Sequence, residues 1–271
     1  MSPGIEPAAH PKGCCAAVYG SDLVALLLGD AYHPGGSGLT RRLAARLAPA
    51  SGEHVLDVAS GRGASALLLA TEYGCTVTGV DLAGPNVAAA THTARSAGLA
   101  DRVLFRQGDA ERLPIGPASV DVVICECAFC TFPDKPTAAG ELARVLVPGG
   151  RLGVSDVTAV PDQLPPELTG LGAWIACVAD ARPLDEYAAL LASAGLTVTH
   201  TERHDGAVTA MIDQIEARLT VVRLTAGQRA ESLGLDFARA PAVLAAARAA
   251  VADGVLGYAI LTATKPAVGP R

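Results

Sequence analysis

Short apolar segments alternate with amphipathic segments through the middle of the chain. Seven apolar runs have the length and composition of strands, at residues 54–60, 76–82, 103–109, 120–126, 151–157, 196–204 and 257–265. Helical periodicity separates most of them, at residues 64–74, 85–98, 135–150 and 184–195. Because strands and helices alternate, the pattern predicts an α/β fold with a doubly wound, mostly parallel sheet. The runs are rich in Val, Ile and Leu, which is typical of strands buried on both faces.

Further helical patterns flank this region, at residues 21–32, 39–48, 170–181 and 207–253. We therefore expect three parts of one domain. Residues 1–50 form an N-terminal cap, and residues 51–160 form the core of the sheet. Residues 161–271 contribute a lid, the last two strands and a helical insertion.

Composition narrows the class of protein. The chain has 271 residues, half of them hydrophobic, which is ample for one large core. Its net charge is −6 and it has no Lys/Arg cluster, which argues against a nucleic-acid partner. No apolar run approaches the ~18 residues of a membrane span. The first residues lack the pattern of a signal peptide, so we expect a cytoplasmic protein whose seven cysteines are thiols rather than disulfides.

A glycine turn joins the first predicted strand to the helix that follows it, in "VLDVASGRGAS" at residues 55–65. Gly61 and Gly63 allow a tight turn and a close approach of a ligand to the backbone, and the helix N-terminus behind them favours negative charge. Nicotinamide, flavin and methyl-donor enzymes all use such a turn, and it is also found in ordinary strand-to-helix connections. The turn alone leaves the ligand open.

Acidic residues at successive strand ends add to this signal. Asp81 ends the second strand, where a carboxylate accepts hydrogen bonds from ribose hydroxyls. Asp109 ends the third strand and is placed to accept a hydrogen bond from an adenine amino group. Asp57, inside the first strand, is placed to orient the turn or to meet an ammonium group.

This ordered set resembles the class I S-adenosylmethionine-dependent methyltransferases over residues 51–160, and "LARVLVPGGRLGVSD" strengthens the resemblance. It implies a seven-stranded Rossmann-like fold and S-adenosyl-L-methionine as cofactor. Ala59 stands where many members have glycine. The resemblance implies the cofactor-binding residues Asp57, Ala59, Gly61, Gly63, Asp81, Leu82, Asp109, Ala110 and Cys125. A dehydrogenase is the weaker alternative, since no Ser/Tyr/Lys relay for hydride chemistry is evident.

Three cysteines follow the fourth predicted strand in "CECAFC": Cys125, Cys127 and Cys130. Acceptors of open α/β sheets bind beyond the carboxyl ends of the strands, which is where this cluster falls. Core packing and a structural zinc site are two interpretations. A third is a soft trivalent element held by thiolates, because soft ligands select soft acceptors. Cys75 fits a buried hydrophobe.

The segment from "VVICECAFCTFPDK" to "WIACVADARPLDEYAALLASAGL" resembles the arsenite methyltransferases. That resemblance implies that Cys127 and Cys177 bind As(III) as substrate, with Cys15 or Cys14 as the third thiol and Cys130 as its rival. It also implies a thiol reductant, thioredoxin or glutathione, as partner. The chain departs from the family in its additional thiols Cys125 and Cys130 and in a shorter N-terminal part.

The leading hypothesis is therefore methylation of thiolate-bound trivalent arsenic or a related metalloid. The alternative is a methyltransferase for a small organic oxygen, nitrogen or carbon acceptor, in which the cysteines are structural and Asp156 or His33 serves as a base. A non-catalytic metalloid binder is a third hypothesis. Other residues considered near the cleft are Tyr19, Tyr32 and Trp174, while His200 and His204 are expected at the surface.

Overall fold

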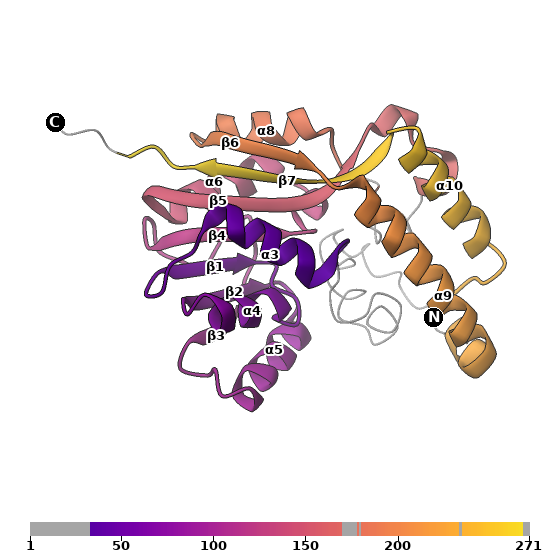
Figure 1. Ribbon diagram of the computed structural model, residues 1–271, viewed down its shortest axis with the longest axis horizontal. Coiled ribbons are helices and arrows are strands. Elements are labelled where there is room, and N and C mark those ends of the chain that lie inside the picture. Colours follow the sequence, from indigo (N-terminus) through magenta and orange to yellow (C-terminus); the bar gives the residue numbers. More distant parts are fainter. Residues whose placement is uncertain (1–32, 170–177, 179, 233–234, 268–271) are drawn as a thin grey trace, which may run out of the picture.

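The computed structural model describes residues 33–169, 178, 180–232 and 235–267. Within these residues the protein is a seven-stranded sheet in the order β3-β2-β1-β4-β5-β7-β6 (Figure 1). The strands are β1 (His54–Val58), β2 (Thr76–Asp81), β3 (Val103–Gln107), β4 (Val120–Glu126), β5 (Leu146–Ala159), β6 (Thr197–Arg203) and β7 (Leu256–Thr264). The first five run parallel, and β7 is antiparallel to both of its neighbours. The predicted mostly parallel, doubly wound sheet is confirmed.

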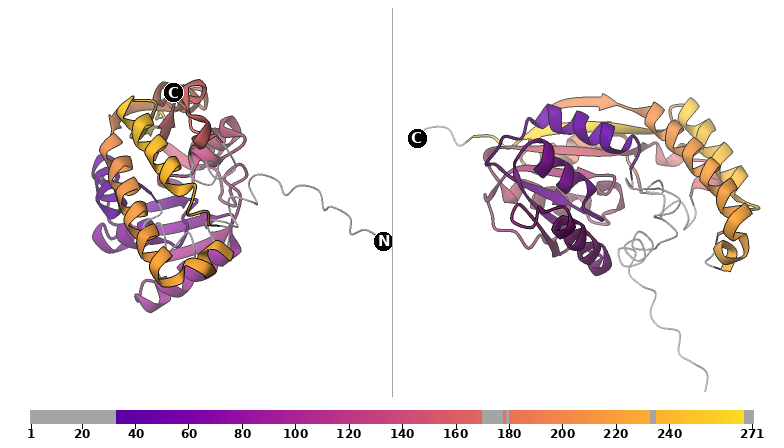
Figure 2. Two further views of the ribbon diagram at one scale, coloured as in Figure 1. Left: turned by 90° about the vertical axis from the view of Figure 1, so that its right-hand side faces the viewer. Right: turned by 60° about the horizontal axis from the view of Figure 1, so that its bottom comes forward.

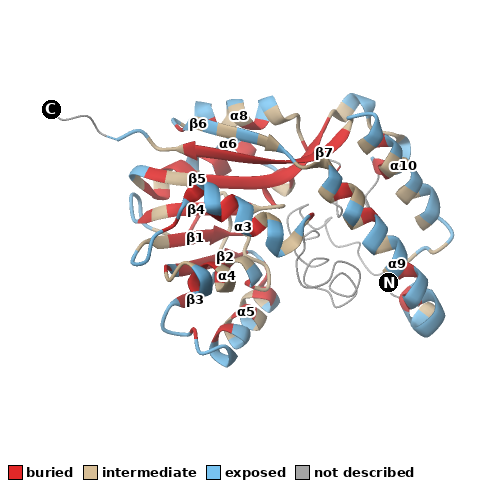
Figure 3. Ribbon diagram, in the orientation of Figure 1, coloured by how far each residue is buried: buried red, intermediate tan, exposed pale blue. Residues whose placement is uncertain are grey.

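Helices cover both faces of this sheet. The helices α3 (Gly36–Leu47), α4 (Ala64–Glu72) and α5 (Gly84–Ser96) pack on one face, and α6 (Lys135–Val145) and α8 (Leu184–Ser193) pack on the other. Each face has its own apolar core, and the strands β1, β2, β4, β5 and β7 are largely buried between them, whereas the edge strand β6 is partly exposed (Figure 3). Burial on both faces explains the continuous apolar runs of the strand sequences. None of the helices in these ranges is long and apolar enough to cross a membrane.

The strand β5 is longer than the sequence pattern predicted. The predicted helix at residues 135–150 ends earlier, at Val145, and Leu146 already pairs with Val120 of β4. The "VPGG" segment then forms an irregularity in the register before Arg151 pairs with Val122. The short-range pattern missed this because proline and glycine are typical of turns, whereas here they are accommodated in a bulge of the strand.

Helix α3 lies directly against the middle of the sheet. Leu43 and Leu47 pack on Gly153 of β5, where an added methyl group would come within 2.7 Å of both side chains. Polar contacts fix the helix at its sides, since Arg41 pairs with Glu72 of α4 and Arg42 with Glu202 of β6. The helix therefore has one defined position beside the carboxyl ends of β4 and β5.

The predicted helical stretch at residues 207–253 is a pair of helices, α9 (Asp205–Ser232) and α10 (Ala240–Ala252). They pack on each other and project beyond the carboxyl end of β6 (Figure 2). A stripe formed by Val208, Ile212, Leu219 and Val222 is buried along α9. This arm starts at the sheet edge beyond which ligands of open α/β sheets bind.

Candidate active site

The glycine turn after β1 adopts left-handed backbone conformations. Gly61 has φ 54° and Gly63 has φ 85°, and Ala59 shares this region at φ 58°. A side chain at Gly63 would meet the Phe105 ring at 2.5 Å, so glycine is required there by both φ and space. Ala59 carries the strain of a methyl group in a conformation that favours glycine. The turn brings the first turn of α4 close to the carboxyl end of β1.

Asp57 lies beneath this turn and is almost completely buried. Its Oδ2 atom has no hydrogen-bond partner among the described residues. Burial raises the pKa of the Asp57 carboxyl well above its usual value. The charges of Glu126 and Asp81 add to this shift, and a hydrogen bond from the Ala66 backbone N–H opposes it. An unsatisfied buried acceptor of this kind suits a ligand that brings a donor and a positive charge.

A second carboxylate, which was not predicted from the sequence, lies beside the turn. Glu126 is the last residue of β4. Its oxygens accept hydrogen bonds from Ser65 at 2.5 Å, Thr40 at 3.2 Å and Ser155 at 3.3 Å. Its position, as an acidic residue at the end of an apolar strand, was a signal in the sequence. The sequence-based interpretation assigned the function of this segment to the cysteines on either side of it instead.

These two carboxylates decide which kind of ligand the α4 N-terminus favours. A free helix N-terminus attracts an anion, as in dinucleotide sites that bind a pyrophosphate there. Here the backbone N–H of Ala66, in the first turn of α4, donates to Asp57, and the side-chain hydroxyl of Ser65 donates to Glu126. Because the protein supplies the negative charge, the site favours a cationic ligand over a phosphate.

The acidic ends of β2 and β3 lie along the same edge. Asp81 is held by the backbone N–H groups of Gly61 and Ala83, each at 2.8 Å, and by the Asn86 amide at 3.2 Å. A carboxylate accepts about four hydrogen bonds, so capacity for a ligand hydroxyl remains. Asp109 accepts the Glu111 N–H at 2.9 Å.

The two apolar members of the predicted cofactor set differ in exposure. Leu82, directly after β2, has an exposed side chain. Ala110, directly after Asp109, is buried. Both adjoin the acidic strand ends, and their contact with the cofactor stays a prediction.

The three thiols after β4 differ in their surroundings. Cys125 and Cys130 are buried in the apolar core on the α6 face of the sheet, and burial raises the pKa of the Cys125 thiol well above its usual value. Cys127 is half-buried, and its backbone is left-handed at φ 52°. The strand ends at Glu126, so Cys127 does not continue the alternation of β4. In the described part of the chain, no three His, Cys, Asp or Glu side chains form a group that could hold a metal ion.

The other candidates are placed as follows. Asp156 is buried in β5 and accepts hydrogen bonds from the backbone N–H groups of Cys130 and Val157. His33 lies 3.4 Å from the Thr40 hydroxyl, so it adjoins Glu126 through one residue. His200 and His204, which were expected at the surface, are half-buried, and both contact Glu202. Cys14, Cys15, Tyr19, Tyr32, Trp174 and Cys177 lie outside the described residues.

Comparisons with known proteins agree with this geometry. Residues 56–154 match the model of a methyltransferase domain. The chain is 33% identical to a 27-O-demethylrifamycin SV methyltransferase of Amycolatopsis mediterranei (strain S699), over 84% of this chain and 83% of that one. It belongs to the class I S-adenosylmethionine-dependent methyltransferases. The geranyl diphosphate C-methyltransferase from Streptomyces coelicolor A3(2) has the same fold, with a TM-score of 0.75 at 17% identity and coverage of 96% and 100% of the two chains.

The cofactor of this methyltransferase is S-adenosyl-L-methionine. Solved methyltransferases of the same fold are complexes with this molecule or with S-adenosylhomocysteine. The residues present fit it, because the unsatisfied Asp57 oxygen and the nearby Glu126 charge suit its ammonium and sulfonium groups. The coarse sequence prediction is therefore confirmed.

The chain resembles arsenite methyltransferases, but it resembles other methyltransferases as well. An arsenite methyltransferase of Halobacterium salinarum (strain ATCC 700922 / JCM 11081 / NRC-1) is 38% identical, over 55% of this chain and 38% of that one. The match therefore spans well under half of that relative. Further matches include O-methyltransferases and a demethylmenaquinone methyltransferase. The family is established for this chain, and the acceptor is a separate question.

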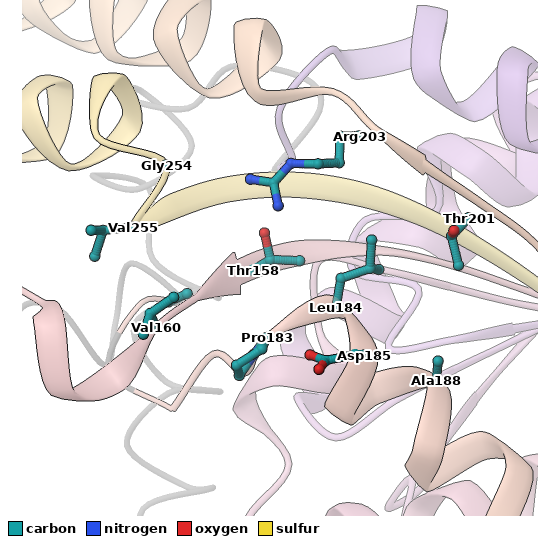
Figure 4. A pocket seen from close by; sticks show the side chains of 11 residues that line it. Thr158, Val160, Pro183, Leu184, Asp185, Ala188, Thr201, Arg203, Gly254 and Val255 are labelled. Atoms are coloured by element: carbon teal, nitrogen blue, oxygen red, sulfur yellow. The ribbon is translucent and has the colours of Figure 1, made fainter.

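A pocket of about 460 Å³ lies on the α8 side, at the carboxyl ends of β5 and β6. Figure 4 shows Arg203 and Asp185 on opposite sides of it. Most of its wall is apolar, including Val160, Leu184 and Val255. Arg203 pairs with Asp205 at 2.9 Å, which partly offsets its charge.

Proposed function

We propose that this methyltransferase methylates a hydroxyl group of a small organic molecule. The observation that carries the proposal is the burial of two of the three thiols after β4. Cys125 and Cys130 lie in the apolar core, so Cys127 is the one thiol of this cluster placed to bind a metalloid, and burial disfavours Cys130 as the third thiolate. The relative matched over most of both chains has a name that describes methylation at oxygen, which supports the same acceptor class.

An oxygen acceptor requires a group that removes the hydroxyl proton. His33 is suited to this role. Its Nδ1 atom lies 3.1 Å from the Pro34 carbonyl oxygen, which only accepts, so we assign the proton of the neutral ring to Nδ1. The Nε2 atom is then unprotonated, and it lies 3.4 Å from the Thr40 oxygen, whose own proton is donated to Glu126. His33 would take the acceptor's proton at Nε2.

The remaining residues bind and align the cofactor. When bound, S-adenosylmethionine supplies a methyl group already activated by a sulfonium. Asp57 and Asp81, at the ends of β1 and β2, would hold its ammonium and ribose ends. Held at both ends, the reactive centre has little freedom, which raises the effective concentration of the two reactants.

Trivalent arsenic is a second candidate acceptor, favoured by Cys127. This residue holds a left-handed backbone at the carboxyl end of β4, a conformation that for a non-glycine residue is common at functional sites. Its half-buried side chain lies at the edge where acceptors bind. Under this hypothesis Cys177 and Cys15 or Cys14 complete the ligand set, with Cys130 as the rival third thiol, and thioredoxin or glutathione serves as reductant.

Methyl-labelled S-adenosylmethionine distinguishes the two acceptors. The purified protein is incubated with a panel of phenols and polyketide alcohols, and separately with arsenite and glutathione, and labelled products are identified by mass spectrometry. We expect label on oxygen of at least one organic acceptor, at a rate that Cys127→Ser leaves within about threefold. Methylated arsenic formed by the wild type and lost in Cys127→Ser, with no organic product, would overturn the proposal in favour of the second candidate.

A further inference from the structure

Glu126 is held by three hydroxyl groups from three different elements. Thr40 belongs to α3, Ser65 to α4 and Ser155 to β5, and all three donate to its carboxylate. The Tyr258 hydroxyl of β7 donates in turn to Ser155 at 3.1 Å. A carboxylate bound in this way has one orientation, so its charge occupies a fixed place at the end of β4.

The strand register places this charge beside Asp57. Asp57 of β1 pairs with Ile124 of β4, and Glu126 follows two residues later. Because side chains alternate along a strand, Asp57, Ile124 and Glu126 project on the same face of the sheet. Burial and then the Glu126 charge raise the pKa of Asp57, as expected for two carboxylates on one face of neighbouring strands.

The two acids differ in exposure. Asp57 is 2% exposed and already accepts the Ala66 N–H, whereas Glu126 is only half-buried. The α4 N-terminus partly balances the charge of Asp57 through the Ala66 N–H, whereas the Ser65 hydroxyl donates to Glu126. Two carboxylates against one helix end leave a net negative potential, and the half-buried Glu126 brings that potential to the open side of the site.

We propose that Glu126 determines the specificity of the cofactor site, because its charge makes the site prefer the cationic methyl donor over the neutral product. S-adenosylmethionine and S-adenosylhomocysteine share the adenine, ribose and amino-acid groups and differ in the methyl group and the sulfonium charge. A fixed negative charge near the sulfur therefore distinguishes them by electrostatics alone. The preference favours exchange of spent product for fresh donor. It depends on the cofactor and not on the acceptor, so it stands or fails independently of the proposed function.

Calorimetric titration of both molecules into Glu126→Gln tests this role. The amide retains an oxygen for the hydroxyl donors but removes the charge. We expect the ratio of donor affinity to product affinity to fall about tenfold, while the Kd of S-adenosylhomocysteine changes less than about threefold. Glu126→Asp, which keeps the charge, should retain most of the wild-type ratio.

Glu72→Gln is the matched control, because Glu72 also anchors α3, through Arg41, but lies at the far end of α4. It should leave the ratio unchanged. If Glu126→Gln weakens both molecules equally, the role of Glu126 is purely structural and the proposal is overturned. The proposal is also overturned if neither affinity changes. If Glu126→Gln does not fold, salt titration of the wild type decides: the affinity ratio should shrink as salt screens the charge, and a constant ratio contradicts the proposal.

Discussion

Asp57 and Glu126 project from neighbouring strands onto one face of the sheet, at the first turn of α4. The helix end that attracts phosphate in dinucleotide enzymes here faces the protein's own carboxylates, with the Ala66 N–H donating to Asp57 and the Ser65 hydroxyl donating to Glu126. This relationship explains why a glycine turn shared by several enzyme classes here serves a cationic methyl donor. It also gives the chain's acidic residues distinct and separately testable effects.

His33→Gln should lower the rate of methyl transfer to an oxygen acceptor by at least about 100-fold, because the base is lost. The Kd of S-adenosylmethionine should change little, since His33 acts on the acceptor. Part of the rate should return at high pH, where the acceptor ionises without help. His92→Gln, on the exposed side of α5, is the control. An unchanged rate for His33→Gln would exclude it as the base.

Ala48→Gly should stabilise the fold by about 1 kcal/mol, because Ala48 ends α3 in the left-handed region at φ 46° and ψ 57°. Urea unfolding measures the change. Ala97, at the end of α5, has φ −83°, so Ala97→Gly should destabilise the protein instead. Destabilisation by Ala48→Gly would show that its methyl group outweighs the strain.

Lys135→Met should destabilise the fold by about 3 kcal/mol, since the buried Lys135 ammonium pairs with Asp180 and donates to the Phe132 carbonyl oxygen. Asp180 would keep Arg182 as its remaining partner. Combining Lys135→Met with Asp180→Leu should recover part of the loss, as urea unfolding of the double-mutant cycle would show. Strictly additive effects would contradict a coupled pair.

Stability in acid should depend on Glu202. Hydrogen bonds from Arg42, followed by those from His200 and Arg46, lower the pKa of the Glu202 carboxyl from 4.5 to about 2. A lowered folded-state pKa gives stability that is present above the unfolded value and lost as pH falls from about 4.5 toward 2.

Glu202→Gln should therefore flatten the fall of Tm across this pH window. The exposed Glu167→Gln is the control and should leave the acid limb of the Tm profile as in the wild type. If the Tm of Glu202→Gln falls as steeply at acid pH as that of the wild type, the loss of stability comes from other carboxylates.

Much of the fold could be predicted because its signals are local. Strand runs, the glycine turn and the acidic strand ends each lie within a few residues, and the parallel topology then brings them to one edge. The "VPGG" segment of β5 was misjudged because its extended form depends on pairing with β4, which a local pattern does not contain.

The site was only partly predictable, because its polar network joins distant residues. Glu126 meets Thr40 across 86 positions and Ser65 across 61, and neither hydroxyl is distinctive in the sequence. The cysteines on either side of Glu126 were conspicuous, yet burial separates Cys125 and Cys130 from the half-buried Cys127. Side-chain type was visible in the sequence, whereas exposure depended on the packing of α6.

The donor site is tested most directly by calorimetry and thermal unfolding of Asp57→Asn. The folded-state pKa of Asp57 is raised, so in the ligand-free protein its charge costs stability as pH rises above the unfolded value near 3.8. The amide should therefore raise the Tm at pH 7 while weakening S-adenosylmethionine at least about tenfold. Unchanged affinity for S-adenosylmethionine, or binding of NAD⁺ with comparable affinity by the wild type, would contradict a cationic donor site built on Asp57.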